Sequence, residues 1–198
     1  MSTATNTENV QVEFSVRTAN KKSQSTISER QTVLAMNYQQ NPKQAWITDF
    51  ASTESQPENI GDTLHTKVTA AGVDIAIGVH KAVGGDSDAI VPGELLSAAL
   101  SSCLDSTIRI IANRLSIKLQ RLSVVVSTEA DVRGTLKLNP NVPVEFQKMH
   151  ISVDLKADPT TKPRMLTALL QAAENSCVVL QTLRTPPEIT TQYKLDCK

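Results

Sequence analysis

Four segments in which apolar and polar residues alternate constrain the fold of this chain most strongly. Side chains two positions apart on a strand share a face, so this alternation predicts strands with one buried and one wet face, mostly paired antiparallel. We expect the second segment to turn at Arg133-Gly134 into a further strand, Thr135–Leu138. The shared-face positions are Val73, Ile75, Ile77 and Val79; Leu122, Val124 and Val126; Met149, Ile151, Val153 and Leu155; and Ile189, Thr191, Tyr193 and Leu195.

Two longer segments have the spacing of helices. The first is Glu94–Leu115, with Pro92 just before it as a residue that favours a helix start. The second is Lys162–Leu183, in which Asn175-Ser176 is expected to cap a break just before Cys177. The order of strands, helix, strands, helix and strand predicts an α+β fold rather than an alternating βαβ one.

The N-terminal residues 1–40 are polar and form an extension to a domain that covers residues 41–198. Within the extension, Val10–Val16 alternates as a strand does, and Ser28–Tyr38 is expected to form a short helix. With 198 residues, the chain is long enough to bury a core of its own.

Composition excludes several classes of partner. The 20 basic residues equal the 20 acidic ones, and aromatic residues make up 3% of the chain, so neither nucleic acid nor an acidic membrane surface is expected as a partner. The N-terminus lacks the basic and apolar regions of a signal peptide, and no uninterrupted apolar run is long enough for a bilayer. We therefore expect a cytoplasmic protein.

Three cysteines lie far apart in the sequence: Cys103, Cys177 and Cys197. Neither CxxC nor zinc-ligand spacing is present, and the histidines show no metal-ligand spacing. In a reducing compartment such thiols are packing residues or redox groups. Cys197 is penultimate and is interpreted as a bystander.

The first two thiols each lie in an apolar helical segment. On the first helix, Asp105 faces away from Cys103 and has the i,i+4 spacing of an ion pair with Arg109. Cys177 lies where a new helical turn is expected to begin, and the helix dipole there would favour a thiolate. From the residues alone, two packing cysteines and a redox pair both remain open.

The segments around both thiols resemble those of the OsmC/Ohr proteins, the osmotically inducible and organic-hydroperoxide-resistance proteins. VPGELLSAALSSCL is similar to their Pro-x-Glu-Leu-Leu…Ala-Ala…Cys motif, and AAENSCVVLQTL resembles their second cysteine segment. The resemblance extends from about Asp62 to Leu195.

This resemblance implies a curled antiparallel sheet packed on two long central helices, in an intertwined homodimer with active sites at the interface. It also implies peroxide reduction in which Cys103 becomes a sulfenic acid and Cys177 resolves it as a disulfide. The substrate would be an organic hydroperoxide or another apolar small molecule, and an external dithiol would be the reductant. The resemblance implies neither a metal nor an organic cofactor.

The residues that would activate Cys103 differ from the family pattern. The peroxidases have a glutamate directly after the helix-start proline, whereas Gly93 stands there and the acid is Glu94. No arginine occurs between Arg30 and Arg109, so His80 or Lys81 is the nearest candidate for the family's arginine. His80 could pair with a thiolate or act as a base.

Three functions follow as alternatives. The first is a thiol peroxidase that uses Cys103 and Cys177, assisted by His80 and Glu94. The second is an OsmC-like protein that binds an apolar small molecule without peroxide chemistry. The third is another thiol enzyme, with His80 as the base for Cys103.

Overall fold

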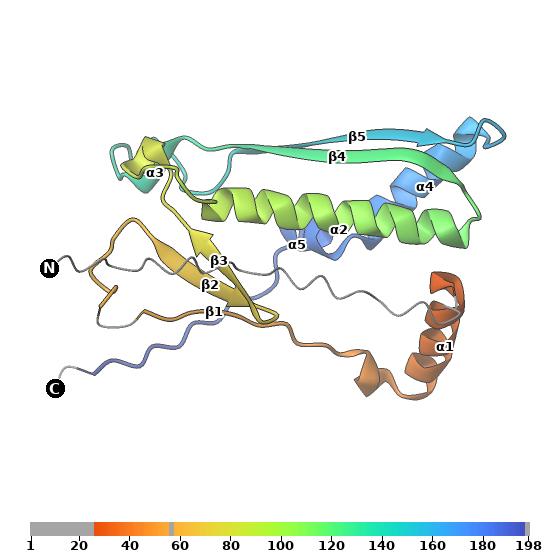
Figure 1. The fold of residues 1–198 in the computed structure, drawn as a ribbon, viewed down its shortest axis with the longest axis horizontal. Helices are drawn as coiled ribbons and strands as arrows, with labels where there is room; N and C mark the ends of the chain where they lie inside the picture. The colour runs from red at the N-terminus through yellow and green to blue at the C-terminus, as the bar shows by residue number, and fades with distance from the viewer. Residues whose placement is uncertain (1–25, 56–57, 197–198) are drawn as a thin grey trace, which may run out of the picture.

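The computed structural model describes residues 26–55 and 58–196 (Figure 1). The expected strand Val10–Val16 lies outside these residues. In chain order the elements are α1 (Ile27–Gln40), η1 (Pro42–Ala45), β1 (Ala51–Thr53), β2 (Thr66–Ala70), β3 (Val73–Ile77), η2 (Lys81–Val83), α2 (Pro92–Arg114), β4 (Leu119–Glu129), α3 (Val132–Thr135), β5 (Lys148–Ala157), α4 (Pro163–Ser176) and α5 (Val178–Arg184). The α+β class is confirmed, and so is the short helix expected at Ser28–Tyr38, which is α1.

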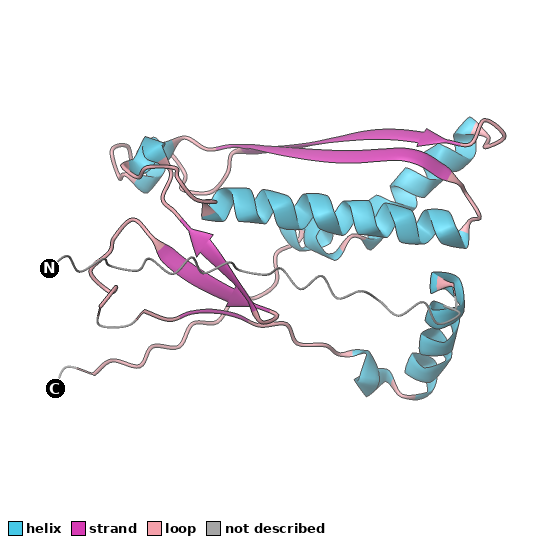
Figure 2. Cartoon of the chain, in the orientation of Figure 1, coloured by secondary structure: helices cyan, strands magenta, loops and turns pink. Residues whose placement is uncertain are grey.

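The strands form two antiparallel sheets rather than the one curled sheet expected (Figure 2). The N-terminal sheet has the order β1-β2-β3. Its β2–β3 hairpin turns through Ala71 and Gly72, whose φ angles of 51° and 77° are those of a two-residue turn that matches the twist of the strands. At the end of β3, Ile77 is buried.

The second sheet is the long β4–β5 pair, which lies over α2 (Figure 1). Its register places Val124 opposite Val153 and Val126 opposite Ile151. These side chains pack against the buried core, while the alternate positions face solvent. The alternation expected for both strands is therefore confirmed.

The core is centred on α2, which contacts β4, α4 and α5. By length and composition alone α2 could cross a membrane, a property that it shares with core helices of soluble proteins. Apolar side chains along one side of α2 are buried against α4 and α5, an arrangement typical of a core helix. The buried residues at this centre are Leu100, Leu104, Ile108, Ala112, Ile117, Leu169, Ala173, Cys177 and Leu180.

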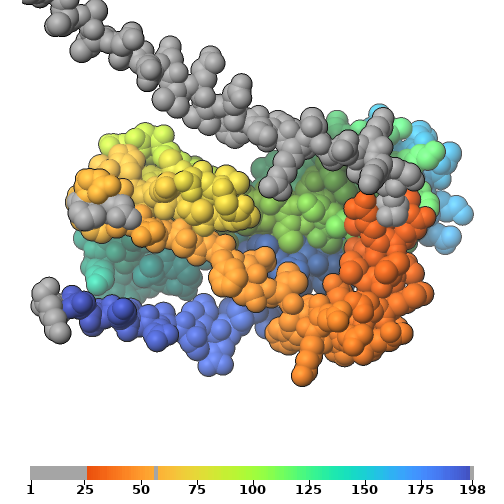
Figure 3. Space-filling view, turned by 60° about the horizontal axis from the view of Figure 1, so that its bottom comes forward, coloured from red at the N-terminus to blue at the C-terminus, as the bar shows by residue number. Residues whose placement is uncertain are grey.

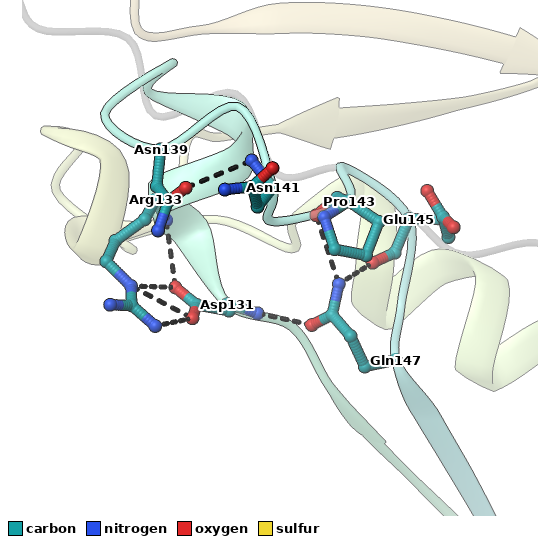
Figure 4. A network of polar contacts seen from close by, with 7 residues as sticks. All are labelled: Asp131, Arg133, Asn139, Asn141, Pro143, Glu145 and Gln147. Carbon is teal, nitrogen blue, oxygen red and sulfur yellow. Dashed lines mark hydrogen bonds and ion pairs between the residues drawn. The ribbon is translucent and has the colours of Figure 1, made fainter.

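The connection between β4 and β5 differs from the expected strand at Thr135–Leu138 (Figure 4). Asp131 caps the short helix α3 and pairs with Arg133, and its backbone N–H donates to Gln147 Oε1 at 2.6 Å. Gly134 is buried against the backbone carbonyls of Val142 and Pro143. These local contacts stabilise a compact loop in place of a strand, so that prediction was wrong. The ion pair of Asp131 with Arg133 therefore lies at the N-cap of α3.

The strand expected at Ile189–Leu195 is also absent from the described chain. Residues 186–196 carry no regular secondary structure, and Ile189, Tyr193 and Leu195 are each about four-fifths exposed. A strand needs a neighbouring strand to pair with its backbone N–H and C=O groups, and within the described residues no strand pairs with this segment.

Candidate functional site

The fold brings Cys103 and Cys177 together. Cys103 lies halfway along α2 and is partly exposed, whereas Cys177 lies at the junction of α4 and α5 and is fully buried. Both are free thiols, and their side chains lie close enough to interact. Two cysteines 74 positions apart in sequence (177 minus 103) are therefore neighbours in one protomer.

The junction arises because the second long helix is interrupted at Cys177. This residue has an extended conformation, with φ −76° and ψ 108°, and is at once the C-cap of α4 and the N-cap of α5. The expected break is therefore confirmed, but Asn175 and Ser176 belong to the last turn of α4 and do not cap α5. An interruption at this point turns the Cys177 side chain toward α2, where Cys103 lies.

The pKa of the Cys177 thiol is raised above its ordinary value, chiefly because the group is buried. The backbone N–H groups of Leu180 and Val179 lower it, as expected at a helix N-terminus, but they do not outweigh burial. The interaction with the neighbouring Cys103 thiol raises this pKa further. The expectation of a thiolate favoured at Cys177 is therefore wrong in direction, and this thiol stays protonated at neutral pH.

Asp105 and Arg109 form the ion pair expected from their spacing, and it lies apart from the thiols. The guanidinium donates to both carboxylate oxygens, at 2.6 and 3.1 Å, and this interaction raises the pKa of Arg109. Near Cys103, the hydroxyl of Thr107 donates to the backbone carbonyl of Cys103 and not to its sulfur. Arg109 is therefore engaged by a carboxylate on its own helix.

His80 and Glu94 line a second region, a cavity of about 970 Å³ at the N-terminus of α2. The backbone N–H of Ala82 donates to His80 Nδ1 at 3.0 Å, so the neutral ring carries its proton on Nε2. Glu94 accepts a hydrogen bond from the backbone N–H of Val91 at 3.0 Å, which caps the helix. The cavity walls are mostly apolar and include Leu64, Ile77, Val79, Val83, Val91, Val132 and Phe146.

Within one protomer the cavity and the thiol pair are separate. Glu94 and Cys103 are nine residues apart on one helix, which is about 13 Å at a rise of 1.5 Å per residue. Neither thiol lines the cavity that holds His80 and Glu94. Of the four expected site residues, the structure thus joins Cys103 with Cys177 and places His80 with Glu94 in a different pocket.

One polar group of the cavity escaped the sequence analysis. His65 bridges two carboxylates, with Nδ1 3.0 Å from Asp62 and Nε2 3.0 Å from Asp88. These interactions raise the pKa of His65, the hydrogen bond with Asp88 most of all. The i,i+3 spacing of Asp62 and His65 was the available signal, but Asp88 is 23 residues further on. Among the described residues, no group of three or more His, Cys, Asp or Glu side chains is arranged to hold a metal ion.

The fold and the paired thiols place this chain among the α+β proteins that carry two neighbouring cysteines. Comparison with known proteins identifies the family to which it belongs. The family model described as OsmC-like protein matches residues 84–192, more than half of the chain. This chain belongs to the OsmC-like family, as its two cysteine segments suggested. No curated protein matches the sequence.

Solved structures agree on the fold. An OsmC-like protein of unknown function from Vibrio cholerae superposes with a TM-score of 0.57 at 15% identity, covering 69% of this chain and 94% of that one. An OsmC-like protein from Mycoplasma pneumoniae superposes with a TM-score of 0.56 at 11% identity, covering 71% of this chain and 89% of that one. An organic hydroperoxide resistance protein from Legionella pneumophila superposes with a TM-score of 0.51 at 20% identity, covering 71% of this chain and 92% of that one. At these identities the likeness establishes the fold alone.

Proposed function

We propose that this protein is a thiol-dependent peroxidase that reduces organic hydroperoxides through Cys103 and Cys177. The observation that carries the proposal is that these two thiols from different helices lie close enough to interact. A family in which one relative is called an organic hydroperoxide resistance protein supports this choice of substrate. We place the reaction in the cytoplasm, where dithiol reductants keep both cysteines reduced.

Exposure assigns the two thiols different roles in the proposed reaction. Cys103 is partly exposed and can meet a peroxide, whereas Cys177 is fully buried and protonated. The Cys103 thiolate attacks one peroxide oxygen, so that an S–O bond forms, the O–O bond breaks and the departing alkoxide takes a proton to become an alcohol. Cys103 is left as a sulfenic acid.

Resolution then requires the second thiol within bonding reach. The Cys177 sulfur attacks the Cys103 sulfur and loses its proton, the S–S bond forms, and the hydroxide that leaves is protonated to water. An external dithiol reduces this disulfide by two exchange steps and is itself oxidised. The burial of Cys177 delays its ionisation until an electrophilic sulfur lies beside it.

His80 and Glu94 enter this proposal through a second copy of the chain. Because about 13 Å of helix separates Glu94 from Cys103 in one protomer, the two can share a site only if different protomers contribute them. We therefore propose a homodimer in which the cavity of one copy faces the thiol pair of the other. The same separation weakens the alternative of a Cys–His enzyme within a single chain.

The test is consumption of cumene hydroperoxide with dithiothreitol as reductant. We expect turnover by the wild-type protein, no turnover by Cys103→Ser, and loss of multiple turnovers in Cys177→Ser. The matched control is Cys197→Ser, which should retain full activity. A wild-type protein that consumes no hydroperoxide under these conditions would rule out the proposal.

The cavity at the N-terminus of α2 favours one competing function, the binding of an apolar small molecule. Its volume and its largely apolar walls are those of a ligand site. Binding of 1-anilinonaphthalene-8-sulfonate that is weakened by Val132→Asp but not by Val125→Asp, in a protein without peroxidase activity, would favour this function. Val132 lines the cavity, whereas Val125 is exposed on β4.

A further inference from the structure

One glycine and one aromatic residue meet in the wall of the cavity at the N-terminus of α2. Gly93 is the second residue of α2, Phe146 stands two residues before β5, and both line the cavity. A Cβ added to Gly93 would lie 2.8 Å from Phe146 Cζ, which is closer than two carbon atoms approach without strain. The ring of Phe146 therefore lies directly on the backbone of the first turn of α2.

The segments that form this cavity lie at one end of the molecule. In Figure 3 the orange and yellow residues of β2, β3 and η2 are on the same side as the teal residues of the connection between β4 and β5. Each of these segments contributes side chains to the cavity lining, and η2 contacts α3. The Phe146 ring therefore faces a space whose other walls come from several parts of the chain.

Hydrogen bonds hold the backbone on both sides of the contact between the glycine and the ring. Gln147 directly follows Phe146, and its Oε1 accepts from the backbone N–H of Asp131 at 2.6 Å (Figure 4). On α2, the hydroxyl of Ser97 donates to the carbonyl of Gly93 at 3.0 Å. Two anchored segments thus place the ring in the cavity wall.

Backbone conformation does not account for the glycine at residue 93. Within the described residues the glycines with a positive φ are Gly72 and Gly84, so the backbone of Gly93 is one that any L-residue adopts. Glycine is also unfavourable in a helix, because it loses more conformational freedom on folding than other residues do. The close approach of the Phe146 ring is what requires the absence of a side chain there.

The charged groups of the cavity disfavour an anionic ligand. Its carboxylates are Asp62 and Glu94, and no Lys or Arg is among the described residues that line it. His65 is held between Asp62 and Asp88, 3.0 Å from each. Glu94, in the first turn, already supplies the negative charge that the N-terminus of α2 favours. An anion would therefore be repelled by the carboxylates, whereas an uncharged ligand would not.

We infer that this cavity selects uncharged ligands that carry an aromatic ring, with Phe146 as its specificity-determining residue. In the described part of the chain, Phe146 is the only Phe, Tyr or Trp that lines the cavity. The other apolar walls are mainly aliphatic side chains, which pack against any apolar group. A flat ligand ring gains an additional offset or edge-to-face contact with Phe146. Gly93 has a positioning role, because its missing side chain makes room for the ring.

The inference deepens the proposed function by naming the class of substrate. If the cavity takes the organic part of a hydroperoxide, the preferred substrate is an uncharged aryl hydroperoxide and not a fatty acid hydroperoxide, which carries a carboxylate. This statement about the substrate rests on the proposed function. The preference of the cavity for a ring does not require turnover, so the experiment measures binding.

The first measurement is a fluorescence titration of the full-length protein with N-phenyl-1-naphthylamine, an uncharged probe. We expect saturable binding, with a Kd about fivefold or more below that of 1-anilinonaphthalene-8-sulfonate, which has the same rings and an added sulfonate. Displacement of the probe then compares 2-phenyl-2-propanol with 2-cyclohexyl-2-propanol, which has the same carbon skeleton without the aromatic ring.

The ratio of the two alcohol affinities isolates the contribution of the Phe146 ring. Phe146→Leu keeps an apolar side chain and removes the ring, so it should reduce the preference for the phenyl alcohol about threefold or more. A merely structural role would weaken both alcohols equally. Val144→Ala is the matched control, because Val144 is 64% exposed in the same connection and does not line the cavity.

A double-mutant cycle tests the contact between Gly93 and the ring. Gly93→Ala should raise the Kd of N-phenyl-1-naphthylamine about fivefold, because the new Cβ displaces the ring. In a Phe146→Ala background the same substitution meets no ring and should have little further effect. Far-ultraviolet circular dichroism verifies folding, and if Gly93→Ala does not fold, the alcohol ratio in Phe146→Leu still decides.

Four results would overturn the inference: no saturable binding of N-phenyl-1-naphthylamine, equally tight binding of the sulfonate, an unchanged alcohol ratio in Phe146→Leu, or equal effects of Gly93→Ala with and without the ring. Hydroperoxide consumption is measured separately. A wild-type protein with the ring preference but no turnover would support the inference and contradict the proposed function. Turnover without a ring preference would do the reverse.

Discussion

Cys177 on one helix junction lies beside Cys103 on the central helix, and the two thiols differ in exposure: Cys177 is fully buried and Cys103 is partly exposed. The contact joins the middle of the central helix to the only break in the second long helix. The order of events in the proposed reaction follows from this asymmetry, because a peroxide reaches the open thiol first.

We predict that one equivalent of cumene hydroperoxide converts the reduced protein to a Cys103–Cys177 disulfide. The two sulfurs are already neighbours, so resolution should outpace further oxidation. Peptide mass spectrometry after alkylation should detect the linked peptides. In Cys177→Ser the product should instead be a sulfenic acid on Cys103, trapped by dimedone, while Cys197→Ser should behave as wild type. A disulfide that requires Cys197 would contradict the prediction.

A second prediction concerns the ionisation of Cys177. Because Cys103 contributes to the raised pKa of Cys177, Cys103→Ser should lower that pKa, although burial should keep it above the free value of about 8.5. The pH dependence of alkylation by iodoacetamide, in a Cys197→Ser background, measures the change. Asp105→Asn is the control, since Asp105 is not among the groups that shift this thiol.

The same raised pKa gives the sign of a stability effect. The folded state binds the Cys177 proton more tightly than the unfolded chain does. The stabilisation is therefore fully present below the unfolded pKa of about 8.5 and is lost as the pH rises through the higher folded value. Cys177→Ala should show a smaller loss of stability with alkaline pH than wild type, and an identical pH profile would contradict this account.

The third prediction concerns the histidine bridge between Asp62 and Asp88. Since the hydrogen bond with Asp88 is the largest cause of the raised pKa of His65, Asp88→Asn should lower that pKa. Histidine proton signals followed by NMR as a function of pH provide the measurement. Asp74→Asn is the control, because Asp74 pairs with Lys67 instead, at 2.9 Å, and should leave His65 unchanged.

The bridge also has a pH dependence of known sign. Both ring nitrogens of His65 donate to carboxylates only when the ring is protonated. Its stabilising effect is present below the ordinary pKa of about 6.5 and is lost as pH rises through the raised folded value. The three side chains are substantially exposed, so solvent and salt weaken the interaction.

The sequence predicted those strands and helices in which apolar residues recur often enough to show a strand or helix period. The alternation of β4 and β5 and the apolar side of α2 could be recognised because burial dictates residue type at alternate or helical positions. Strand β2 (Thr66–Ala70) was missed because Val68 is its only large apolar residue. The segment Ile189–Leu195 has the pattern of a strand, but pairing depends on a neighbour that the segment itself does not specify.

The candidate site could be predicted only in part, for a geometrical reason. Two cysteines in similar helical contexts indicated a pair, and the fold brings them into contact. The grouping of His80 with Cys103 failed within one chain because closeness in sequence to the start of α2 does not bring a residue near its middle. The bridge formed by His65 depends on its contact with Asp88, which lies 23 residues further along the chain, and no local sequence pattern indicates such a contact.

A fourth prediction tests the core beneath the thiols. Leu169 on α4 is fully buried, so Leu169→Ala should lower the free energy of unfolding by about 2–5 kcal/mol through lost burial and a residual cavity. Urea denaturation measures the change. Leu138→Ala is the matched control, because Leu138 is 69% exposed, and it should change stability by less than about 0.5 kcal/mol. Equal effects of the two substitutions would contradict the placement of the core.

The last prediction concerns Gly134, a buried residue of the short helix α3 in the connection between β4 and β5. An added Cβ at this residue would overlap the backbone carbonyl oxygens of Pro143 and Val142, and a backbone cannot yield as a flexible side chain does. Gly134→Ala should therefore destabilise the protein by about 1–3 kcal/mol, measured by urea denaturation. Gly61→Ala is the control, because no heavy atom lies within 4 Å of its added Cβ. Residues of α3 and of this connection line the cavity that holds His80 and Glu94. Gly134→Ala should therefore also weaken the binding of 1-anilinonaphthalene-8-sulfonate in that cavity, while Gly61→Ala should not.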